Sequence, residues 1–358
     1  MEKKRILFVA GGISSQYLFD TGMYYSASKE EKDFLKYTLI YAVLFPDGKI
    51  NFPKSLEKED YEKAPKYDIF EGGCQIKKMN IDCIFYLPSS WKGLTVYRNV
   101  FELLDIPIAG PSAECQNLAF NKILTRAKLG TEGILLPPGC NVKFEDKDNL
   151  QKVLNQFREK GFTFPVIVKA PCEDDSLGLS VVREEKDLIE AINYAFDFQN
   201  KNEILIEKFI PGREIRTAVI QDDNQNLVML PVCEYGIDPY KIRENKHKIY
   251  EWRAITGQES EIIDRIILDE KTDSVIIQRL KDISFKCFKG LNVNDWAVFD
   301  FRYNTEEDNF YFIEAGLFCH FSPSCNIGKL ARDIGITKEQ HFDTTFRNAI
   351  KRYNASKA

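Results

Sequence analysis

Two carboxylates in the last third of the chain carry the most specific chemical signal in this sequence. Residues 299–315 contain two aromatic-rich segments joined by a polar turn, which predicts a β-hairpin. If Tyr303 lies opposite Tyr311, then Asp300 lies opposite Glu314 and both side chains point to one face of the sheet. Opposed carboxylates repel each other unless a cation lies between them, and carboxylate oxygens suit a hard cation. The pair therefore predicts a Mg²⁺ site of the kind used in phosphate transfer; two exposed acids on a surface hairpin are the alternative.

A lysine at the end of an apolar run is the second signal. The segment FPVIV at residues 164–168 predicts a buried strand, and Lys169 follows at its mouth. A lysine offers a compact positive charge, so a lysine in this place is poised to hold an anion such as phosphate. The alternative is an ordinary core strand with a solvated lysine at its end.

Two glutamates separated by a Pro-Gly turn suggest a nucleoside site. Glu207 and Lys208 end a further apolar run, and Glu214 follows seven residues after Glu207. The apolar side chains of Phe209 and Ile210 suit a purine base, while carboxylates accept hydrogen bonds from ribose hydroxyls. Two surface glutamates beside a turn are the alternative.

The elements that position these residues alternate between strands and helices. Apolar runs at residues 5–10, 38–45 and 82–87 predict strands, and apolar residues between 94 and 104 fall at helical spacing. Strands that alternate with helices imply an open α/β sheet over residues 1–115, with ligands expected at the carboxyl ends of the strands.

Two smaller α+β units are expected after this sheet. Residues 116–211 begin inside a helix predicted over 115–129 and form a small unit whose strands can close over a base like a lid. Residues 212–358 alternate strands with a helix at 274–288 and end in a charged amphipathic helix near 338–353.

Length, charge and cysteine content exclude several classes of protein. A chain of 358 residues exceeds the usual size of one hydrophobic core, and 44% apolar with 29% charged residues is ordinary for a soluble globular protein. The net charge of −5, with basic residues spread along the chain, gives no basic stripe for nucleic acid. Nine cysteines without a C-x-x-C pair, and only three histidines, predict reduced thiols in the cytoplasm and no zinc site. The first apolar run is too short for a signal peptide or a membrane span, so no membrane partner is expected.

The order of these features resembles the ATP-grasp superfamily, and specifically its D-alanine–D-alanine ligase branch. The segments that carry the resemblance are FPVIVKAPCEDDSLGLS (164–180), NEILIEKFIPGREI (202–215), VFDFRY (298–303) and FYFIEAG (310–316). The resemblance implies an α/β protein with an ATP-grasp fold, in which an N-terminal open α/β domain precedes two α+β subdomains that sandwich ATP. It also implies ATP and Mg²⁺ as cofactors, small-molecule substrates and a homodimer.

The resemblance carries over to individual residues. Lys122, in the pair Asn121-Lys122, and Lys169 correspond to lysines that contact the ATP phosphates. A plain helix-surface lysine is the alternative for Lys122. The residues expected to bind the rest of the nucleotide are Ser176, Gly178, Glu207, Lys208, Phe209, Ile210 and Glu214.

The loop after Lys169 departs from the family, where it is usually rich in glycine and serine. Here Asp174 and Asp175 stand beside a polyanion. At about 4 Å each carboxylate would repel a phosphate by roughly 4 kcal/mol per unit charge at an effective dielectric near 20, so both acids must face away or bind a cation. Asp175 is our candidate to hold the ammonium of the attacking amino acid or to select its side chain.

A polar, basic segment at residues 234–253 resembles the mobile loop that closes over the active site in these ligases. Lys246 or Lys248 is the candidate for contact with the terminal phosphate, and the spacing does not decide between them. A solvated basic loop is the alternative.

Two residues expected from the family are missing. Val298 stands where the family has an arginine two residues before the metal aspartate. Arg302, on the same strand face as Asp300, is the candidate to supply that charge to the developing oxyanion. Gly316 stands where the family has a metal-binding asparagine, and a water could complete the Mg²⁺ shell there.

The reaction that the resemblance implies has two steps. ATP phosphorylates a carboxylate or an equivalent carbonyl oxygen, and an amine then attacks the acyl phosphate to give ADP, phosphate and a new C–N bond. The segments similar to the ligase that joins an amino acid to mycosporine-glycine are GLTVYRNVFELLDIP (93–107), DDSLG (174–178), VFDFR (298–302) and FIEAGLFCHFSPS (312–324). The expected enzyme is therefore an amino-acid ligase acting on an acceptor such as mycosporine-glycine. A D-alanine–D-alanine ligase, a non-catalytic nucleotide-binding protein and a small-molecule-binding protein are the alternatives.

D-alanine is not expected as the substrate: the acyl donor should lack a free α-ammonium or present it differently, and the amine donor should be an ordinary small amino acid. In the family a glutamate after the first strand holds the ammonium of that substrate, and a His-Gly pair follows the strand before the substrate-binding helix. Here the corresponding stretches read GGISSQY (11–17) and LPSSWKG (87–93), with neither feature present.

Overall fold

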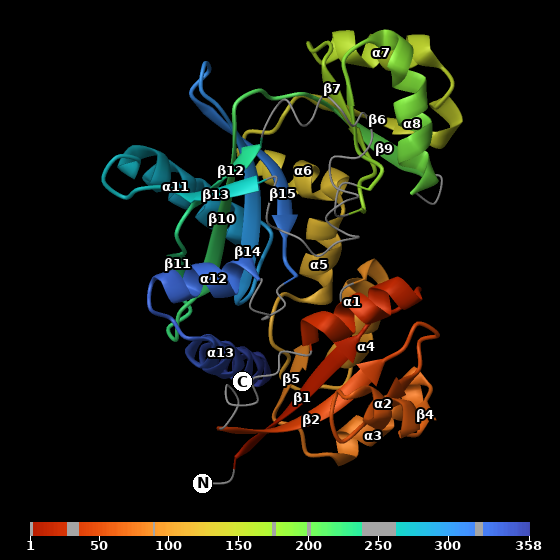
Figure 1. The fold of residues 1–358 in the computed structure, drawn as a ribbon, viewed down its shortest axis with the longest axis vertical. Helices are drawn as coiled ribbons and strands as arrows, with labels where there is room; N and C mark the ends of the chain where they lie inside the picture. The colour runs from red at the N-terminus through yellow and green to blue at the C-terminus, as the bar shows by residue number, and fades with distance from the viewer. Residues whose placement is uncertain are drawn as a thin grey trace.

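Three β-sheets organise the chain, and Figure 1 shows them at the bottom, the upper right and the left of the view. The structure is a computed structural model that describes residues 3–26, 36–88, 90–173, 177–198, 202–237, 263–318 and 325–358. Among these residues, no helix combines the length and the apolar character needed to cross a membrane.

The first sheet contains the predicted N-terminal strands. Its five strands run in the order β4-β3-β2-β1-β5, with β1 parallel to β2 and β5. The strands are β1 (Lys4–Gly11), β2 (Tyr37–Leu44), β3 (Ile50–Asn51), β4 (Lys66–Tyr67) and β5 (Cys83–Tyr86). The helices of this part are α1 (Gln16–Ser26), α2 (Lys58–Lys63), α3 (Ile69–Lys78), the π-helix η2 (Gly93–Tyr97) and α4 (Arg98–Glu102). Every residue of β1 from Ile6 onward is buried, as its continuous apolar run predicts, so the predicted open α/β sheet is confirmed.

The second sheet lies within the segment predicted to form a lid, and residues 139–208 are called the lid from here on. Its four antiparallel strands run in the order β6-β9-β7-β8. The elements are β6 (Gly139–Lys143), η3 (Phe144–Asp146), α7 (Leu150–Glu159), β7 (Val166–Lys169), β8 (Ser180–Val182), η4 (Glu185–Asp187), α8 (Leu188–Asp197) and β9 (Glu203–Lys208). Helices α7 and α8 cover one face of this sheet (Figure 1). Helix α7 does so with Val153, Leu154 and Phe157, whose spacing puts them on one side of the helix.

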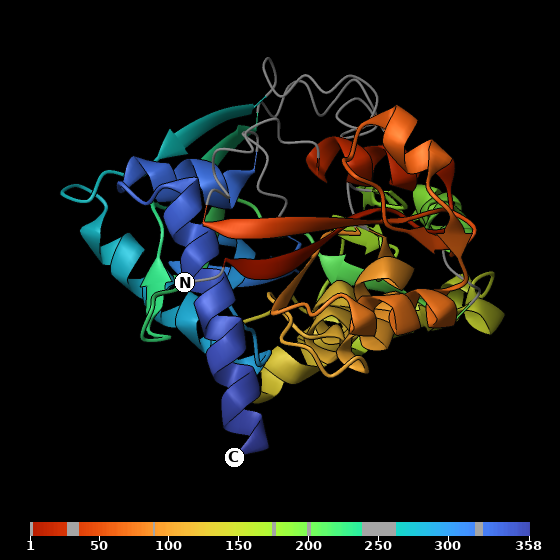
Figure 2. The same ribbon diagram turned by 90° about the horizontal axis from the view of Figure 1, so that it is seen from below.

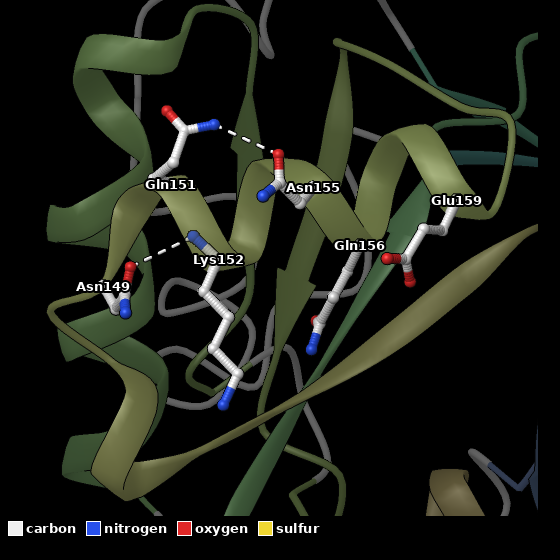
Figure 3. A pocket seen from close by; sticks show the side chains of 6 residues that line it. All are labelled: Asn149, Gln151, Lys152, Asn155, Gln156 and Glu159. Atoms are coloured by element: carbon white, nitrogen blue, oxygen red, sulfur yellow. Dashed lines mark hydrogen bonds between the residues drawn. The ribbon is translucent and has the colours of Figure 1, made fainter.

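A hollow of about 510 Å³ lies on the solvent side of α7 (Figure 3). The polar side chains that line it are Asn149, Gln151, Lys152, Asn155, Gln156 and Glu159. Figure 3 shows two of their hydrogen bonds, from Gln151 Nε2 to Asn155 Oδ1 and from Lys152 N to Asn149 Oδ1, each 3.1 Å long. All six residues lie on α7 or at its N-cap and none is a predicted site residue, so the hollow is a surface feature of the lid.

The third sheet contains the predicted acid-bearing hairpin. Its strands run in the order β13-β12-β10-β14-β15, and β11 pairs with β10. The strands are β10 (Arg213–Gln221), β11 (Leu227–Met229), β12 (Cys233–Ile237), β13 (Ile263–Ile267), β14 (Trp296–Asn304) and β15 (Asn309–Gly316). The helices packed on it are α5 (Ala113–Phe120), α6 (Lys122–Thr131) and α11 (Ser274–Gly290). Phe299, Phe301 and Phe312 fill this interface, so the alternate residues of β14, including Asp300, point to the opposite face.

The C-terminal helices return to the first sheet. They are α12 (Asn326–Asp333) and α13 (Lys338–Lys357). Figure 2 shows α13 beside the strands of the first sheet. Phe342 and Phe346 of α13 contact Phe85 of β5, and Phe8 of β1 belongs to the same core. Trp296 of β14 joins the same core. One shared apolar core therefore fixes the first sheet relative to the third.

Helices α5 and α6 correct the single helix predicted over 115–129. The helix is interrupted at Asn121. Asn121 Oδ1 caps α6 by accepting hydrogen bonds from the N–H groups of Ile123 and Leu124 at 3.0 and 3.2 Å. Both helices pack on the third sheet, and the boundary proposed between residues 115 and 116 falls within α5. We therefore propose that the lid unit begins near residue 138, just before β6.

Candidate active site

Asp300 and Glu314 are cross-strand neighbours on β14 and β15, as predicted. The register behind this pairing differs from the prediction, because Tyr303 pairs with Phe310 and not with Tyr311. A β-bulge beside Asp300 then adds one residue to β15 and brings Glu314 opposite. The predicted pairing of the acids is confirmed, and the predicted register of the tyrosines is wrong by one residue.

Each of the two acids is paired with a cation from another element. Arg216 on β10, the cross-strand partner of Asp300, donates from Nε to Oδ1 at 2.5 Å and from Nη2 to Oδ2 at 2.7 Å. Lys122, at the start of α6, places Nζ 3.4 Å from Glu314 Oε2. The four side chains form a charged row in the order Arg216, Asp300, Glu314 and Lys122. The two cations offset the repulsion between the two acids.

Lys122 also joins the acid pair to the lid. Its Nζ donates to Glu173 O at 2.5 Å in the loop after β7, and its backbone N–H donates to Pro171 O at 2.9 Å. Its side chain is only 9% exposed. The lysine therefore lies where the lid loop meets the acid-bearing hairpin, and its contact with phosphate stays a prediction.

Lys169 is buried and faces Glu207. Its Nζ forms an ion pair with one carboxylate oxygen of Glu207, and Arg126 of α6 pairs with the other oxygen. Arg126 also donates to Pro137 O at 2.6 Å. Glu207 is 2% exposed, so two cations cover its carboxylate and the geometry does not support the predicted contact of this side chain with ribose. Glu207 instead holds Lys169 and Arg126 in place.

Glu214 and Arg302 face each other one row further along the third sheet. They are cross-strand partners, and Arg302 Nη1 lies 3.4 Å from Glu214 Oε2. Arg302 also donates from Nε to Ile210 O at 3.1 Å and from Nη2 to Gly212 O at 2.8 Å. Its guanidinium carbon lies 5.8 Å from the ring centre of Phe209. Arg302 thus lies with the residues predicted to bind the nucleoside, and its predicted oxyanion role gains no support from these contacts.

The other predicted residues fall in separate places. Lys208 Nζ lies 3.9 Å from Glu307 Oε1, across the seam between the lid and the third sheet. Gly178 has a φ of +68°, and a Cβ there would come within 2.9 Å of Ala170 Cβ, so the loop after β7 needs glycine at this point. The predicted residues that lie outside the described part of the chain are Asp175, Ser176, Lys246 and Lys248.

Two arginines of this site are not evident from the sequence alone. Arg216 follows Glu214 by two residues and so shares its strand face, but only the register of β10 against β14 places it opposite Asp300. Arg126 follows Lys122 by one helical turn, and that spacing is the one signal that links it to the site.

Cys172, in the loop after β7, is not an activated nucleophile. Burial raises the pKa of its thiol, and the nearby charge of Lys122 only partly opposes this effect. A thiol with a raised pKa stays protonated at neutral pH, so we expect no covalent step at this residue.

The acid pair suits Mg²⁺ by the chemistry of its oxygens. Mg²⁺ is usually held by one or two carboxylates together with phosphate oxygens and waters, and Asp300 and Glu314 offer two carboxylates on neighbouring strands. Within the described ranges, no group of three or more His, Cys, Asp or Glu side chains could hold a metal ion. Phosphate oxygens and water would therefore have to complete the coordination.

The fold and this site together define the class of protein. An open α/β sheet precedes a lid sheet and a third sheet, lysines lie where the last two meet, and paired acids lie on the third. This is the arrangement of an ATP-grasp ligase, and the fold predicted from the sequence is confirmed. The model of the D-alanine–D-alanine ligase C-terminal family matches residues 130–344, which is more than half of the chain. The chain belongs to the D-alanine–D-alanine ligase family.

Known proteins resemble the chain over most of its length. A D-alanine–D-alanine ligase of Carboxydothermus hydrogenoformans is 27% identical over 240 residues, which cover 67% of this chain and 72% of that protein. The crystal structure of VanG, a D-Ala:D-Ser ligase of Enterococcus faecalis, has a TM-score of 0.77 at 19% identity and covers 98% of this chain and 100% of that chain. The D-alanine–D-alanine ligase of Bacillus anthracis complexed with ATP has a TM-score of 0.67 at 19% identity and covers 99% of this chain and 100% of that chain. The two structures share the fold of this chain.

Proposed function

We propose that this ligase uses ATP to join the carboxylate of one small amino acid to the amine of a second, with D-alanine as the first candidate for the acyl donor. The observation that carries the proposal is the position of Lys122, which contacts both Glu314 on the acid-bearing hairpin and Glu173 O in the lid loop. Lys122 thus links the lid loop, which is predicted to bind the phosphates of ATP, to the acid-bearing hairpin, which is predicted to support transfer of the terminal phosphoryl group.

The residues of the site would act mainly by positioning and by charge neutralisation. Lys122 and Lys169 hold the phosphates, and Glu207 keeps Lys169 oriented. The terminal phosphoryl group passes to a carboxylate oxygen of the donor, and ADP leaves. The amine nitrogen then attacks the acyl carbon, phosphate leaves, and the proton lost from the amine goes to solvent. Mg²⁺ bound by Asp300 and Glu314 would neutralise phosphate charge.

The named relatives support D-alanine as the donor. The relative from Carboxydothermus hydrogenoformans is a D-alanine–D-alanine ligase, and the structural relative VanG is a D-Ala:D-Ser ligase. These proteins couple D-alanine to D-alanine and to D-serine by name. We therefore place a D-alanyl product ahead of the mycosporine-type product expected from the sequence motifs.

A second candidate is the same chemistry on a donor without a free α-ammonium, such as mycosporine-glycine. It is favoured by residues 11–17 and 87–93, which follow the parallel neighbours β1 and β5 and contain no carboxylate to hold an ammonium. The homodimer and the cytoplasmic location expected from the sequence stay predictions.

Release of ADP, measured against pairs of substrates and combined with mass spectrometry of the product, separates the two candidates. D-alanine alone, D-alanine with D-serine, and mycosporine-glycine with serine are the informative pairs, and L-alanine alone is the control. A D-alanyl dipeptide formed with one ADP per product supports the first candidate. Product formed only in the reaction of mycosporine-glycine with serine supports the second. Absence of ADP with every pair would contradict both.

A further inference from the structure

Arg216 occupies one end of the charged row formed by Arg216, Asp300, Glu314 and Lys122. At the other end, Lys122 contacts Glu173 O in the lid loop at 2.5 Å. Because the lid also carries Lys169, the nucleotide phosphates reach the row from the side of Lys122 under the proposed function. Arg216 lies on β10, beyond the acid pair. The row therefore has a nucleotide end at Lys122 and an opposite end at Arg216.

The contacts of Arg216 fix its guanidinium in one orientation. Two N–H···O bonds of 2.5 and 2.7 Å join it to Asp300, and bidentate pairs of this kind hold the plane of the guanidinium. Its side chain is 25% exposed, so it is partly screened from solvent while still at the surface of the site. An arginine keeps its charge throughout the working pH range of proteins. A permanent, oriented positive charge thus lies beside the acid pair.

Arg302, the arginine predicted to supply charge to the developing oxyanion, is engaged elsewhere. Its guanidinium donates to Ile210 O and Gly212 O, in the segment that links the lid to the third sheet. It also lies opposite Glu214, one row away from the acid pair. Arg216 is therefore better placed than Arg302 to act on the reacting atoms.

We propose that Arg216 is a catalytic residue that contacts the oxygens of the phosphoryl group during its transfer to the donor carboxylate. This inference rests on the proposed function. The P–O bond to ADP breaks as a P–O bond to the carboxylate forms, and negative charge spreads over the phosphoryl oxygens. A guanidinium already oriented by Asp300 stabilises that charge without rearrangement of the site.

Binding of MgADP in the presence of aluminium fluoride, which mimics the phosphoryl group in transfer, tests this role without knowledge of the substrate. In calorimetry, aluminium fluoride should tighten MgADP binding to the wild-type protein at least tenfold. Arg216→Ala should bind MgADP alone within threefold of the wild type and should lose the tenfold gain. Arg216→Gln, which can still donate a hydrogen bond to Asp300, should behave alike and replaces the alanine variant if that variant does not fold.

Arg279→Ala is the matched control. Arg279 also makes two bonds to an aspartate, both 2.6 Å long, but its partner Asp308 lies at the exposed turn of the hairpin. This variant should keep the full gain. A wild-type protein without the gain, or an Arg216 variant that retains it, would overturn the role of Arg216 alone. A wild-type protein that does not bind MgADP would overturn the proposed function itself.

Discussion

Asp300 lies opposite Glu314 because the strand that carries Glu314 contains one extra residue. Phe301 pairs with Phe312, but the next pair joins Asp300 to Glu314, which leaves Ile313 between the two pairs. Without this bulge Asp300 would face the apolar side chain of Ile313. The metal site that we propose therefore depends on one residue inserted in β15.

Neutralising either acid should impair turnover. Asp300→Asn and Glu314→Gln should each lower kcat at least about hundredfold, equivalent to about 2.7 kcal/mol of transition-state stabilisation, because an amide brings no charge to a bound cation. A titration of ATP-dependent turnover with Mg²⁺ should show a higher half-saturation concentration in both variants. Glu306→Gln, at the exposed turn of the same hairpin, is the control and should change neither value. An unchanged Mg²⁺ response in both site variants would remove the metal assignment.

Lys169→Met should abolish ATP-dependent turnover while the protein still folds. Methionine keeps the length of the side chain but removes the charge expected to hold phosphate. Without the lysine charge, Glu207 loses one of its two partners, but Arg126 still pairs with its carboxylate. The loss of stability should therefore stay below the about 3–5 kcal/mol caused by breaking an isolated buried pair.

Urea unfolding and ADP release measured on the same preparations check the prediction for Lys169. The double variant Lys169→Met with Glu207→Gln should regain neither stability nor activity, because it also removes the carboxylate partner of Arg126. Turnover within tenfold of the wild type in the single variant would show that Lys169 serves packing alone.

Two glycines beside the site should respond differently to substitution, because one position has room for a side chain and the other does not. Among the described residues a Cβ at Gly316 would meet only Val298 Cβ, at 3.8 Å, so Gly316→Asn should change the free energy of unfolding by less than about 0.5 kcal/mol. A Cβ at Gly212, where φ is +110°, would lie 2.1 Å from Tyr303 O, so Gly212→Ala should cost at least about 2 kcal/mol. Urea unfolding measures both values, and equal stability of the two variants would contradict the backbone geometry of the link between lid and third sheet.

Gly316→Asn also tests the composition of the metal site. The asparagine would restore an oxygen ligand next to the acid pair, so the Mg²⁺ concentration for half-maximal turnover should fall at least threefold. Gly316→Leu, similar in size but without an oxygen, should leave that concentration unchanged or raise it.

His341 should make the protein less stable in mild acid. Burial lowers the pKa of His341 to about 4, and the charge of Asp295 only partly opposes this effect. A histidine in the unfolded chain has a pKa near 6.5, so between these values the unfolded chain binds a proton that the folded chain does not. Stability should therefore fall as the pH drops below 6.5, by about 2 kcal/mol at pH 5 from this residue. Urea unfolding of His341→Gln at pH 7 and pH 5 should show a smaller drop than the wild type, and equal drops would contradict the assignment.

The parts of the fold that follow from local pattern were predictable. The apolar run of β1 and the aromatic segments of β14 and β15 predict strands because burial of successive or alternate side chains leaves a direct mark on the sequence. The break between α5 and α6 leaves no such mark. The apolar spacing runs on through Asn121, and the break depends on its cap and on the tertiary hydrogen bond from Lys122 N to Pro171 O.

The contacts of the site were predictable where both residues lie on one hairpin. They were not predictable where the two residues come from elements far apart in the sequence. Asp300 and Glu314 share one hairpin, so their pairing could be read from the turn. Arg216 reaches Asp300 from a strand 84 residues earlier, and Arg126 reaches Glu207 across 81 residues. Such contacts depend on strand register and helix packing, which no local pattern records. For the same reason the covered position of Glu207 differs from the ribose contact predicted for it.

The central claim, that a carboxylate is activated as an acyl phosphate at this site, is tested most directly by oxygen transfer. D-alanine labelled with ¹⁸O in its carboxylate is incubated with ATP and Mg²⁺, and the released phosphate is examined by mass spectrometry. If the donor carboxylate is phosphorylated and the amine then displaces phosphate, one labelled oxygen should appear in each phosphate formed with product. Mycosporine-glycine labelled in the same way serves if it proves to be the donor. Product formed with unlabelled phosphate, or no product from either donor, would contradict the account.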